Sequence, residues 1–344
     1  AGMSALVIGA FDREKERPGL LYLGYALCGL AVLAKGLTGF ALPGIIFLLY
    51  FIVSGDWSRL RRMRVITGGA LALALAAPWY VYLSIVSASR KLLDDEGKTF
   101  FTRFVLHDPL YRLASGVHGD RGGFAYFIEQ LGLGTHPWFA FMVYGGARSA
   151  ASLDKRRNSW NREHRVELFI FIWALAAYGL YSFSVTKFHH YALPAIPALA
   201  ILAALWLKRW AEQPDKGRAS LLLPLGLVLI VALVSRDIRL MPMGLVETCG
   251  YNSTRAFRTE AALPGQIGYA VIYGLMSMTL ISLLVLKRER LKRYLAPTLT
   301  VGALLGALFT GWYFFGAMGQ HWTQKHIFET YFALRQPDEP VGAY

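Results

Sequence analysis

Nine long stretches of this 344-residue chain are predominantly apolar and contain no lysine or arginine. They constrain the fold more than any other feature, because about 20 consecutive apolar residues cross a bilayer as one helix. They predict an all-α fold, a polytopic bundle of transmembrane helices. The stretches are residues 20–34, 36–53, 66–86, 124–146, 166–184, 191–207, 219–234, 267–286 and 296–317.

The beginning of the chain is also apolar, but only over residues 1–11, before the charged segment 12–18. Eleven residues are too few to cross a bilayer. We therefore interpret them as the last part of a further helix, and we expect the chain to be a fragment of a longer protein.

The basic residues are distributed unevenly between the loops that separate the apolar stretches. Of the 36 Lys and Arg residues, 22 lie in one set of alternate loops and 14 lie in the other set, which is far longer. Short cytoplasmic loops carry an excess of positive charge, so the dense set predicts the cytoplasmic side. Topology thus explains the net charge of +14, and we exclude nucleic acid as a partner. The dense loops are residues 12–18, 54–64, 148–165, 208–218 and 287–293.

This topology predicts one transmembrane domain, residues 1–317, and an outer-face tail, residues 318–344. The domain has two large outer loops, residues 87–122 and 235–266. Seven of the eight histidines lie on the outer side, so we expect the chemistry on that face. The localisation expected is the inner (plasma) membrane of a bacterium, in a multi-pass arrangement, with the active face periplasmic or extracellular.

Part of the first outer loop has its own pattern. Phe100, Phe101 and Phe104 recur at helical spacing among charged residues, and Pro109 should end or kink a helix there. The pattern predicts an amphipathic helix over residues 98–113 that lies in the outer membrane interface.

Lys35 is the first candidate site residue. It separates two apolar stretches with almost no loop, and Gly36 and Gly39 permit the tight turn that this requires. A cation at the membrane surface suits a lipid phosphate. The alternative is a lysine that only extends its side chain to the interface.

The second candidate is a cluster of four polar residues, Lys187, His189, His190 and Tyr191. Lys supplies a cation, and His and Tyr supply hydrogen bonds, so the cluster could hold a phosphate or pyrophosphate. Pro194 and Pro197 follow, which predicts an irregular start of the next helix. An ordinary polar turn with interfacial aromatic residues explains the same composition.

The third candidate lies in the first outer loop. Its histidines and aspartates could ligate a divalent metal, although their spacing matches no strict metal signature. Solvated loop charges are the alternative, and no cofactor is indicated with certainty. Arg112 and Arg121 could contact phosphate or sugar instead. The potential metal ligands are His107, Asp108, His118 and Asp120.

Three of these stretches together resemble a known family, over residues 1 to about 210. They are GLAVLAKGLTGFALPGIIFLLY around Lys35; APWYVYL with FFTRFVLHDPLYRL and the segment from His118 to Trp138; and VTKFHHYALPAIPALAILA around Lys187. In this order they resemble the bacterial polyprenyl-phosphate-dependent glycosyltransferases of the GT-C fold. That family is related to the family 39 protein mannosyltransferases and to the lipid A aminoarabinose transferase.

The resemblance implies transfer of a sugar from a polyprenyl-phosphate donor to a protein or lipid acceptor at the outer face. Lys35 and Lys187 match basic positions that face the lipid phosphate in the family. His107 and Arg112 match polar positions of its outer loop only loosely, because the usual spacing is altered here. The catalytic base implied is an Asp on an earlier outer loop, so it would lie upstream of this chain.

Two alternatives come from other function classes. A non-catalytic membrane subunit, or pseudoenzyme, could use the same scaffold to bind lipid or a partner protein. A transporter should have ionisable residues at mid-membrane depth, whereas the lysines and arginines here gather at the ends of the apolar stretches. We therefore expect a glycosyltransferase, or part of one.

Overall fold

The structure is a computed structural model, and it describes residues 1–11, 17–93, 97–107, 126–155, 161–184, 187–212, 222–240, 263–316, 319 and 325–335. Every regular element within these ranges is a helix. The chain divides into two compact units, which are described separately below. Unit 1 comprises residues 1–131 and 140–223, and unit 2 comprises residues 132–139 and 224–344.

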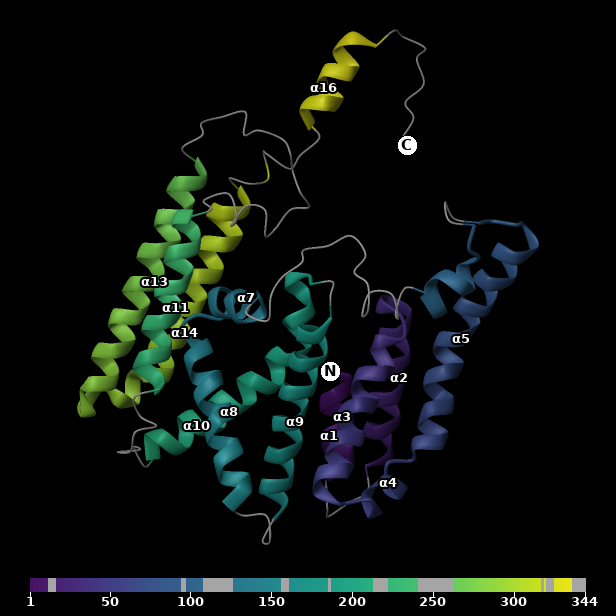
Figure 1. Cartoon of the computed structure of the whole chain (residues 1–344), viewed down its shortest axis with the longest axis horizontal. Helices are drawn as coiled ribbons and strands as arrows, with labels where there is room; N and C mark the ends of the chain where they lie inside the picture. The colour runs from purple at the N-terminus through teal and green to yellow at the C-terminus, as the bar shows by residue number, and fades with distance from the viewer. Residues whose placement is uncertain are drawn as a thin grey trace. The chain divides into compact units, whose positions relative to one another are not determined.

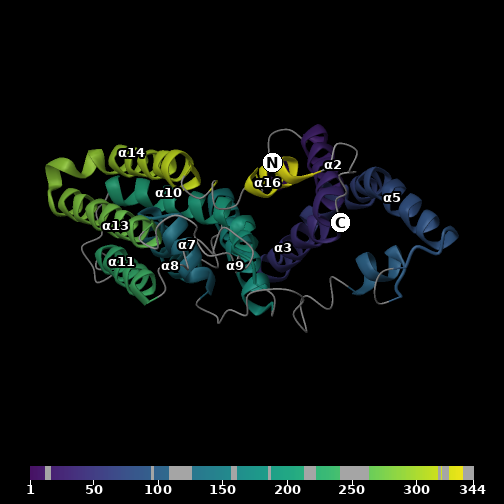
Figure 2. The same cartoon turned by 90° about the horizontal axis from the view of Figure 1, so that it is seen from above.

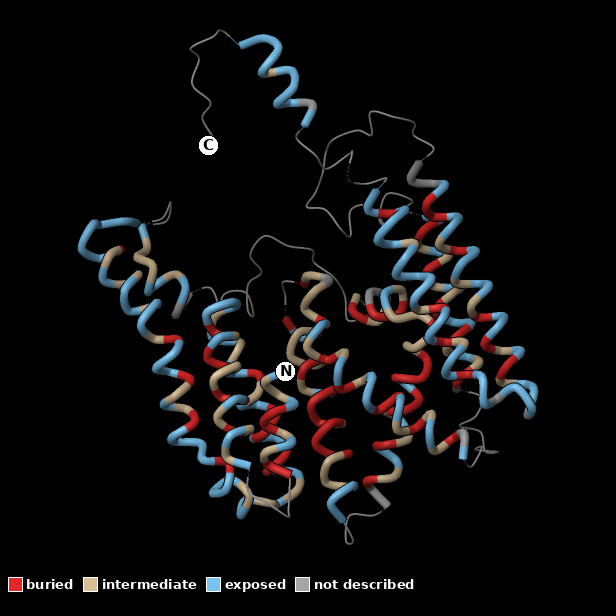
Figure 3. Tube along the Cα trace, turned by 180° about the vertical axis from the view of Figure 1, so that it is seen from behind, coloured by how far each residue is buried: buried red, intermediate tan, exposed pale blue. Residues whose placement is uncertain are grey.

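Six described segments are long and apolar enough to cross a membrane, which confirms the predicted class of fold. Two shorter apolar helices, Gly2–Phe11 and Thr38–Ser54, accompany them. Many of their large apolar side chains are exposed (Figure 3), such as Leu73 and Ile85. Such surfaces are costly in water but not against lipid tails. The six segments are Pro18–Lys35, Val65–Ser89, Arg162–Phe183, His190–Trp210, Gln266–Lys287 and Leu295–Phe314.

In unit 1, α2 (Pro18–Lys35) lies at the centre of the first helices, in contact with α1 (Gly2–Phe11), α3 (Thr38–Ser54) and α5 (Val65–Ser89) (Figure 1). Two hydrogen bonds show how α5 runs relative to α2. Tyr25 Oη donates to Met63 O at 3.1 Å, and Tyr80 Oη donates to Val32 O at 2.8 Å. The earlier residue of α2, Tyr25, bonds to Met63, just before α5, and the later residue, Val32, bonds to Tyr80, further along α5. Helices α2 and α5 therefore run in the same direction.

The rest of unit 1 is built on α9 (Arg162–Phe183), which packs against α3 and against α10 (Ile196–Glu212). The rings of Phe11, Phe47 and Tyr50 surround Phe169 of α9, with centroid distances of 4.6–5.5 Å. Between α9 and α10, η3 (His189–Ala195) is a 3-10 helix. It confirms the irregular start predicted from the two prolines.

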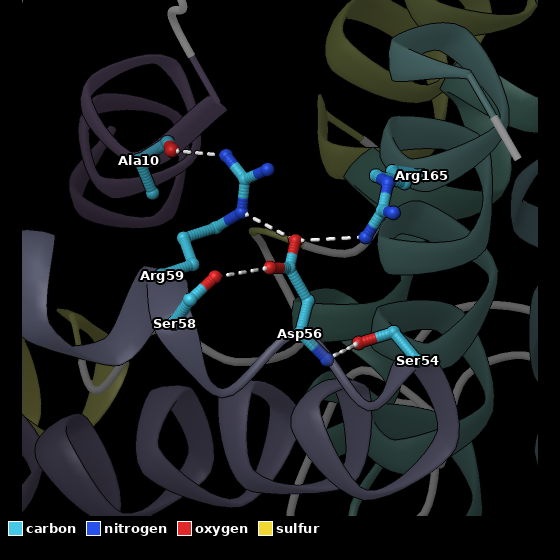
Figure 4. Close-up of polar contacts among 6 residues, drawn as sticks. All are labelled: Ala10, Ser54, Asp56, Ser58, Arg59 and Arg165. Atoms are coloured by element: carbon cyan, nitrogen blue, oxygen red, sulfur yellow. Dashed lines mark hydrogen bonds and ion pairs between the residues drawn. The ribbon is translucent and has the colours of Figure 1, made fainter.

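At the end of unit 1 where α9 begins, one carboxylate, Asp56, lies between α3 and the short α4 (Ser58–Arg62) and pairs with two arginines (Figure 4). Its Oδ2 lies 2.9 Å from Arg59 Nε and 2.9 Å from Arg165 Nη1, and Arg59 also donates to Ala10 O at 2.6 Å. Burial tends to raise the pKa of Asp56. The hydrogen bond and charge of Arg59, together with the charge of Arg165, outweigh burial and lower that pKa below its ordinary value.

A second carboxylate, which is buried, joins α9 to α10. Glu167 accepts two hydrogen bonds from Arg209, at 3.1 and 2.9 Å, and one from Ser149 Oγ at 2.7 Å. Trp206 donates to Ser149 Oγ at 2.6 Å and lies under the Arg209 guanidinium. The buried carboxylate of Glu167 is thus paired with a guanidinium and hydrogen-bonded, which is how a buried charge becomes tolerable.

The predicted span 124–146 was wrong as a single helix. The structure has α7 (Tyr126–Gly134) and α8 (Trp138–Lys155), separated by a turn. Pro137 has no N–H to continue the helix and disfavours helical backbone at the preceding residue. With nine residues, α7 rises only about 14 Å, too little to cross a bilayer.

Unit 2 contains α11 (Leu222–Leu240), of which residues 224–240 belong to the unit, α13 (Leu263–Lys287) and α14 (Leu295–Leu308). Figure 2 shows α11, α13 and α14 alongside one another. Ile230, Val234 and Ile238 pack against Ile272 of α13. Two further short helices, η5 (Glu289–Tyr294) and η6 (Phe309–Phe314), flank α14, and α16 (Lys325–Leu334) lies in the tail. Both α11 and α13 extend into the stretch 235–266 that was predicted as loop.

Candidate functional site

The predicted turn at Lys35 is present, and both glycines act as expected. Gly36 adopts φ +74°, a left-handed conformation that suits glycine. A Cβ on Gly39 would lie 2.5 Å from the carbonyl carbon of Ala31, so only glycine lets α3 approach α2 this closely. Lys35 is therefore the last residue of α2, where a positive charge is favoured by the helix dipole.

Lys35 lies next to a residue that is 156 positions further along the sequence. Its Nζ is 5.1 Å from the centroid of the Tyr191 ring, a cation–π contact. Lys35 itself is exposed. The first and the third of the stretches that carry the family resemblance thus meet at one end of unit 1, which the sequence alone could not show.

Tyr191 belongs to a cluster of rings at that end. Its centroid lies 5.2 Å from Tyr181, 5.3 Å from Phe188 and 4.9 Å from His190. His190 also stacks on Phe188 at 5.6 Å. The cluster places partly buried rings directly beside an exposed cation. Such a surface suits a ligand that has both an apolar part and an anionic part.

Lys187 has different surroundings from Lys35. Its side chain is buried, with an exposed fraction of 5%. Its Nζ donates to Ser182 O at 2.9 Å and to Ser184 O at 2.5 Å, at the C-terminal end of α9. Terminal carbonyls of a helix have no partner within the helix, and a lysine can satisfy them. The structure gives Lys187 this capping role, and its predicted contact with phosphate stays a prediction.

The second stretch of the resemblance reaches the same end of unit 1. The ring of Tyr80, whose hydroxyl bonds to α2, lies 6.1 Å from Phe100, and Phe100 stacks on Phe104 at 4.9 Å. Ser87, near the end of α5, accepts a hydrogen bond from Phe100 N at 3.1 Å and donates to Leu92 O at 2.8 Å. Ser87 thus ties the segment around Phe100 to α5.

The predicted interfacial helix is described only in its first half. Residues 100 and 101 are helical, and η1 (Thr102–His107) continues them as a π-helix. Phe101 and Phe104 are exposed, as an interfacial position requires. Residues 108–113 lie outside the described ranges.

The remaining predicted site residues are only partly covered by the structure. His107 and His189 have described backbones, but their side chains lie outside the described residues, as do Arg112 and Arg121 entirely. Among the described residues there is no group of three His, Cys, Asp or Glu side chains that could hold a metal. Because His118 and Asp120 also fall outside them, the divalent metal stays a prediction.

Sequence reasoning missed three residues of this region: Tyr80, Ser87 and Tyr181. Tyr80 belongs to the stretch APWYVYL, but its side chain was not identified there as a site residue. Ser87 and Tyr181 lie at the end of an apolar stretch or within one and match no motif. Their contacts at this end of unit 1 depend on how α5 and α9 pack, which the sequence does not show. The one available signal was a hydroxyl group near a helix end, which often makes a local hydrogen bond.

No family model matches the chain, but several curated proteins are similar to it. The undecaprenyl phosphate-alpha-4-amino-4-deoxy-L-arabinose arabinosyl transferase 1 of Proteus mirabilis is 24% identical over 239 residues, which is 68% of this chain and 40% of that protein. The corresponding transferase of Edwardsiella ictaluri is 26% identical over 292 residues, or 81% of this chain and 47% of that protein. The chain therefore spans less than half the length of these relatives.

The solved structures that are similar to this chain are also of an ArnT protein. The crystal structure of ArnT from Cupriavidus metallidurans bound to undecaprenyl phosphate aligns with a TM-score of 0.67 and 21% identity, over 99% of this chain and 57% of that one. The apo ArnT structure gives a TM-score of 0.61. The chain has the fold of this part of ArnT, and the GT-C fold predicted from the sequence is confirmed.

Proposed function

We propose that this chain is part of a glycosyltransferase that takes its sugar from a polyprenyl-phosphate donor and transfers it to a protein or lipid acceptor at the outer membrane face. The observation that carries the proposal is the contact between Lys35 and Tyr191. It joins two distant stretches of the family resemblance, and the same end of unit 1 includes Tyr80 and Phe100 of the remaining stretch.

The chemistry of this end suits such a donor. A polyprenyl phosphate has a long apolar chain and one anionic group. In the proposal, the exposed ammonium of Lys35 binds the phosphate, and the rings around Tyr191 contact the isoprenoid units next to it. His190 and Tyr191 orient the phosphate through hydrogen bonds.

The proposed reaction is a displacement at the anomeric carbon of the sugar. The bond between that carbon and the phosphate oxygen breaks, the acceptor forms the new bond, and the electron pair leaves with the phosphate. Lys35 stabilises the negative charge that develops on that phosphate. The acceptor's proton goes to the Asp that the family resemblance implies upstream of this chain.

The relatives' names support a lipid-linked aminoarabinose as the donor sugar, since they are named for its transfer from undecaprenyl phosphate. For this chain that sugar is part of the proposal. Lys187 supports the site by fixing the turn that carries His190 and Tyr191, and its own contact with phosphate belongs to the same proposal.

Binding of undecaprenyl phosphate to the purified chain in lipid nanodiscs tests the proposal without requiring turnover. Replacing Lys35 by alanine should weaken binding about tenfold or more, because a hydrogen bond to a charged group contributes about 1.5–3 kcal/mol. Lys35→Arg should keep part of the affinity. Lys208→Ala is the matched control, since Lys208 is exposed at the end of α10 and pairs only loosely with Glu212, at 4.0 Å.

The variant Lys187→Ala distinguishes a role of lysine in stabilising the fold from a role in binding the phosphate. We expect it to lower thermal stability, because two buried carbonyls lose their donor. Lys35→Ala should lower stability much less, because Lys35 is exposed. Equal affinity of wild type and Lys35→Ala would overturn the phosphate site. Binding that depends on Lys35, but no sugar transfer by the full-length protein, would favour the non-catalytic lipid-binding subunit.

A further inference from the structure

The helix α16 in the tail has one apolar side and one polar side. With 100° between successive residues, the apolar side chains occupy one continuous arc and the polar ones occupy the opposite arc. Lys325, Glu329 and Thr330 lie on the polar arc. The apolar arc is formed by Ile327, Phe328, Tyr331, Phe332 and Leu334.

The apolar arc is exposed in the structure. Phe328 has an exposed fraction of 46% and Leu334 one of 79%, and Ile327 and Phe332 are exposed as well. Figure 3 colours nearly all of α16 as exposed. A helix with such an arc is stable only when the arc is covered by protein or by lipid.

The position of α16 in the sequence indicates what can cover its apolar arc. Ten residues, 315–324, separate it from the candidate membrane span Leu295–Phe314. Ten extended residues reach about 35 Å at most, so α16 lies within that distance of the end of the span and can reach the bilayer surface.

The end of that span has the residues that mark a membrane–water interface. Trp312 is 89% exposed, and Tyr313 and Phe315 are also exposed. Tryptophan and tyrosine are enriched at this depth, where an apolar ring can sit in the headgroup region. The chain therefore leaves the bilayer within a few residues of Trp312.

The charges of α16 suit the same location. Lys325 Nζ lies 3.6 Å from Glu329 on the polar arc. Arg335, just after the helix, places its guanidinium 4.7 Å from the centroid of the Phe332 ring. An arginine at the border of an apolar arc can reach the headgroups while its stem lies along apolar groups.

We propose that α16 is an interfacial helix that lies in the membrane surface, with Phe328 and its apolar neighbours inserted into the lipid and Lys325 and Glu329 facing water. The occupant of the apolar arc is the bilayer itself. The helix thereby fixes the tail to the membrane beside the last span. This inference is independent of the proposed glycosyltransferase activity.

Fluorescent labels on the two arcs test the proposal in the full chain in nanodiscs. Two single-cysteine variants, Phe328→Cys and Thr330→Cys, are made in a background in which Cys28 and Cys249 are replaced by alanine, and each is labelled with an environment-sensitive dye. Both positions are on one short helix, about 160° apart around its axis, so Thr330→Cys is the matched control. Lipids that carry a shallow nitroxide quencher report contact with the membrane.

The label at residue 328 should show blue-shifted emission and lose most of its intensity when quencher lipids are present, and the label at residue 330 should change little. If neither label is quenched, α16 is in water or on protein, and the proposal is wrong. Equal strong quenching of both labels would also overturn it, because the whole tail would then be buried in lipid.

Discussion

Lys35 and Lys187 show how similar sequence contexts lead to different residue environments. Both lysines lie beside the end of an apolar stretch, and both were predicted to contact a lipid phosphate. Gly36 turns the chain and leaves Lys35 exposed beside Tyr191. The ammonium of Lys187 is instead buried and donates to two carbonyls at the end of α9. A hydrogen bond within a turn depends on backbone geometry, which residue types do not specify.

Asp56 leads to a prediction about pH. Its pKa is lowered in the folded protein, so the ionised carboxylate stabilises the fold. That contribution is fully present above the ordinary pKa of about 3.9 and is lost as the pH falls through the lower pKa of the folded state. The thermal midpoint in detergent should therefore differ between wild type and Asp56→Asn at pH 7, and the difference should shrink as the pH falls below about 4.

The Asn variant keeps the shape of the side chain but not its charge, and Arg59 and Arg165 lose their shared partner. Glu212→Gln is the control, since Glu212 is exposed and its ion pair with Lys208 is long, at 4.0 Å. It should show little difference from wild type at either pH. A constant difference between wild type and Asp56→Asn from pH 7 to pH 3 would contradict the role of the ionised Asp56.

The close contact between α2 and α3 depends on the missing side chain of one glycine, Gly39. A Cβ on Gly39 would meet the backbone of Ala31 at 2.5 Å, whereas a Cβ on Gly44, in the same helix, would meet nothing within 4 Å. Gly39→Ala should destabilise the protein by about 1–3 kcal/mol, as overpacking does. Gly44→Ala should be neutral, or stabilising by up to about 1 kcal/mol because a helical glycine is removed.

Unfolding of the two glycine variants in mixed detergent micelles measures this difference. If Gly39→Ala is as stable as Gly44→Ala, the two helices can separate without cost, and the close approach contributes nothing to the fold.

The elements also show which parts of the fold could be predicted. The apolar stretches predicted the long helices, and Gly36 and Gly39 predicted the turn, because membrane crossing and close packing depend on local composition. The break between α7 and α8 was missed, although Pro137 lies there. A proline within a membrane helix is often tolerated, as Pro43 in α3 and Pro78 in α5 are. Whether a proline ends a helix depends on neighbouring helices, which the sequence pattern does not include.

For the whole molecule, the candidate site and the Asp56 cluster lie at opposite ends of the helices of unit 1. α3 begins just after Lys35 and ends just before Asp56. The excess of Lys and Arg in the loop 54–64 predicts that the Asp56 end is cytoplasmic. The proposed function needs the Lys35 end on the other side, because the acceptor is expected at the outer face.

Cysteine labelling in intact bacterial cells tests this orientation. In a background without Cys28 and Cys249, Leu37→Cys and Trp57→Cys place one thiol at each end of α3, and both native side chains are exposed. A membrane-impermeant maleimide should label residue 37 in intact cells but residue 57 only after the membrane is made permeable. The two positions are twenty residues apart in the sequence and flank one apolar helix, so each is the control for the other. Labelling of residue 57 alone in intact cells would place the Lys35 site in the cytoplasm. The charge distribution would then have to be explained by something other than topology, and transfer at the outer face would be excluded for this site.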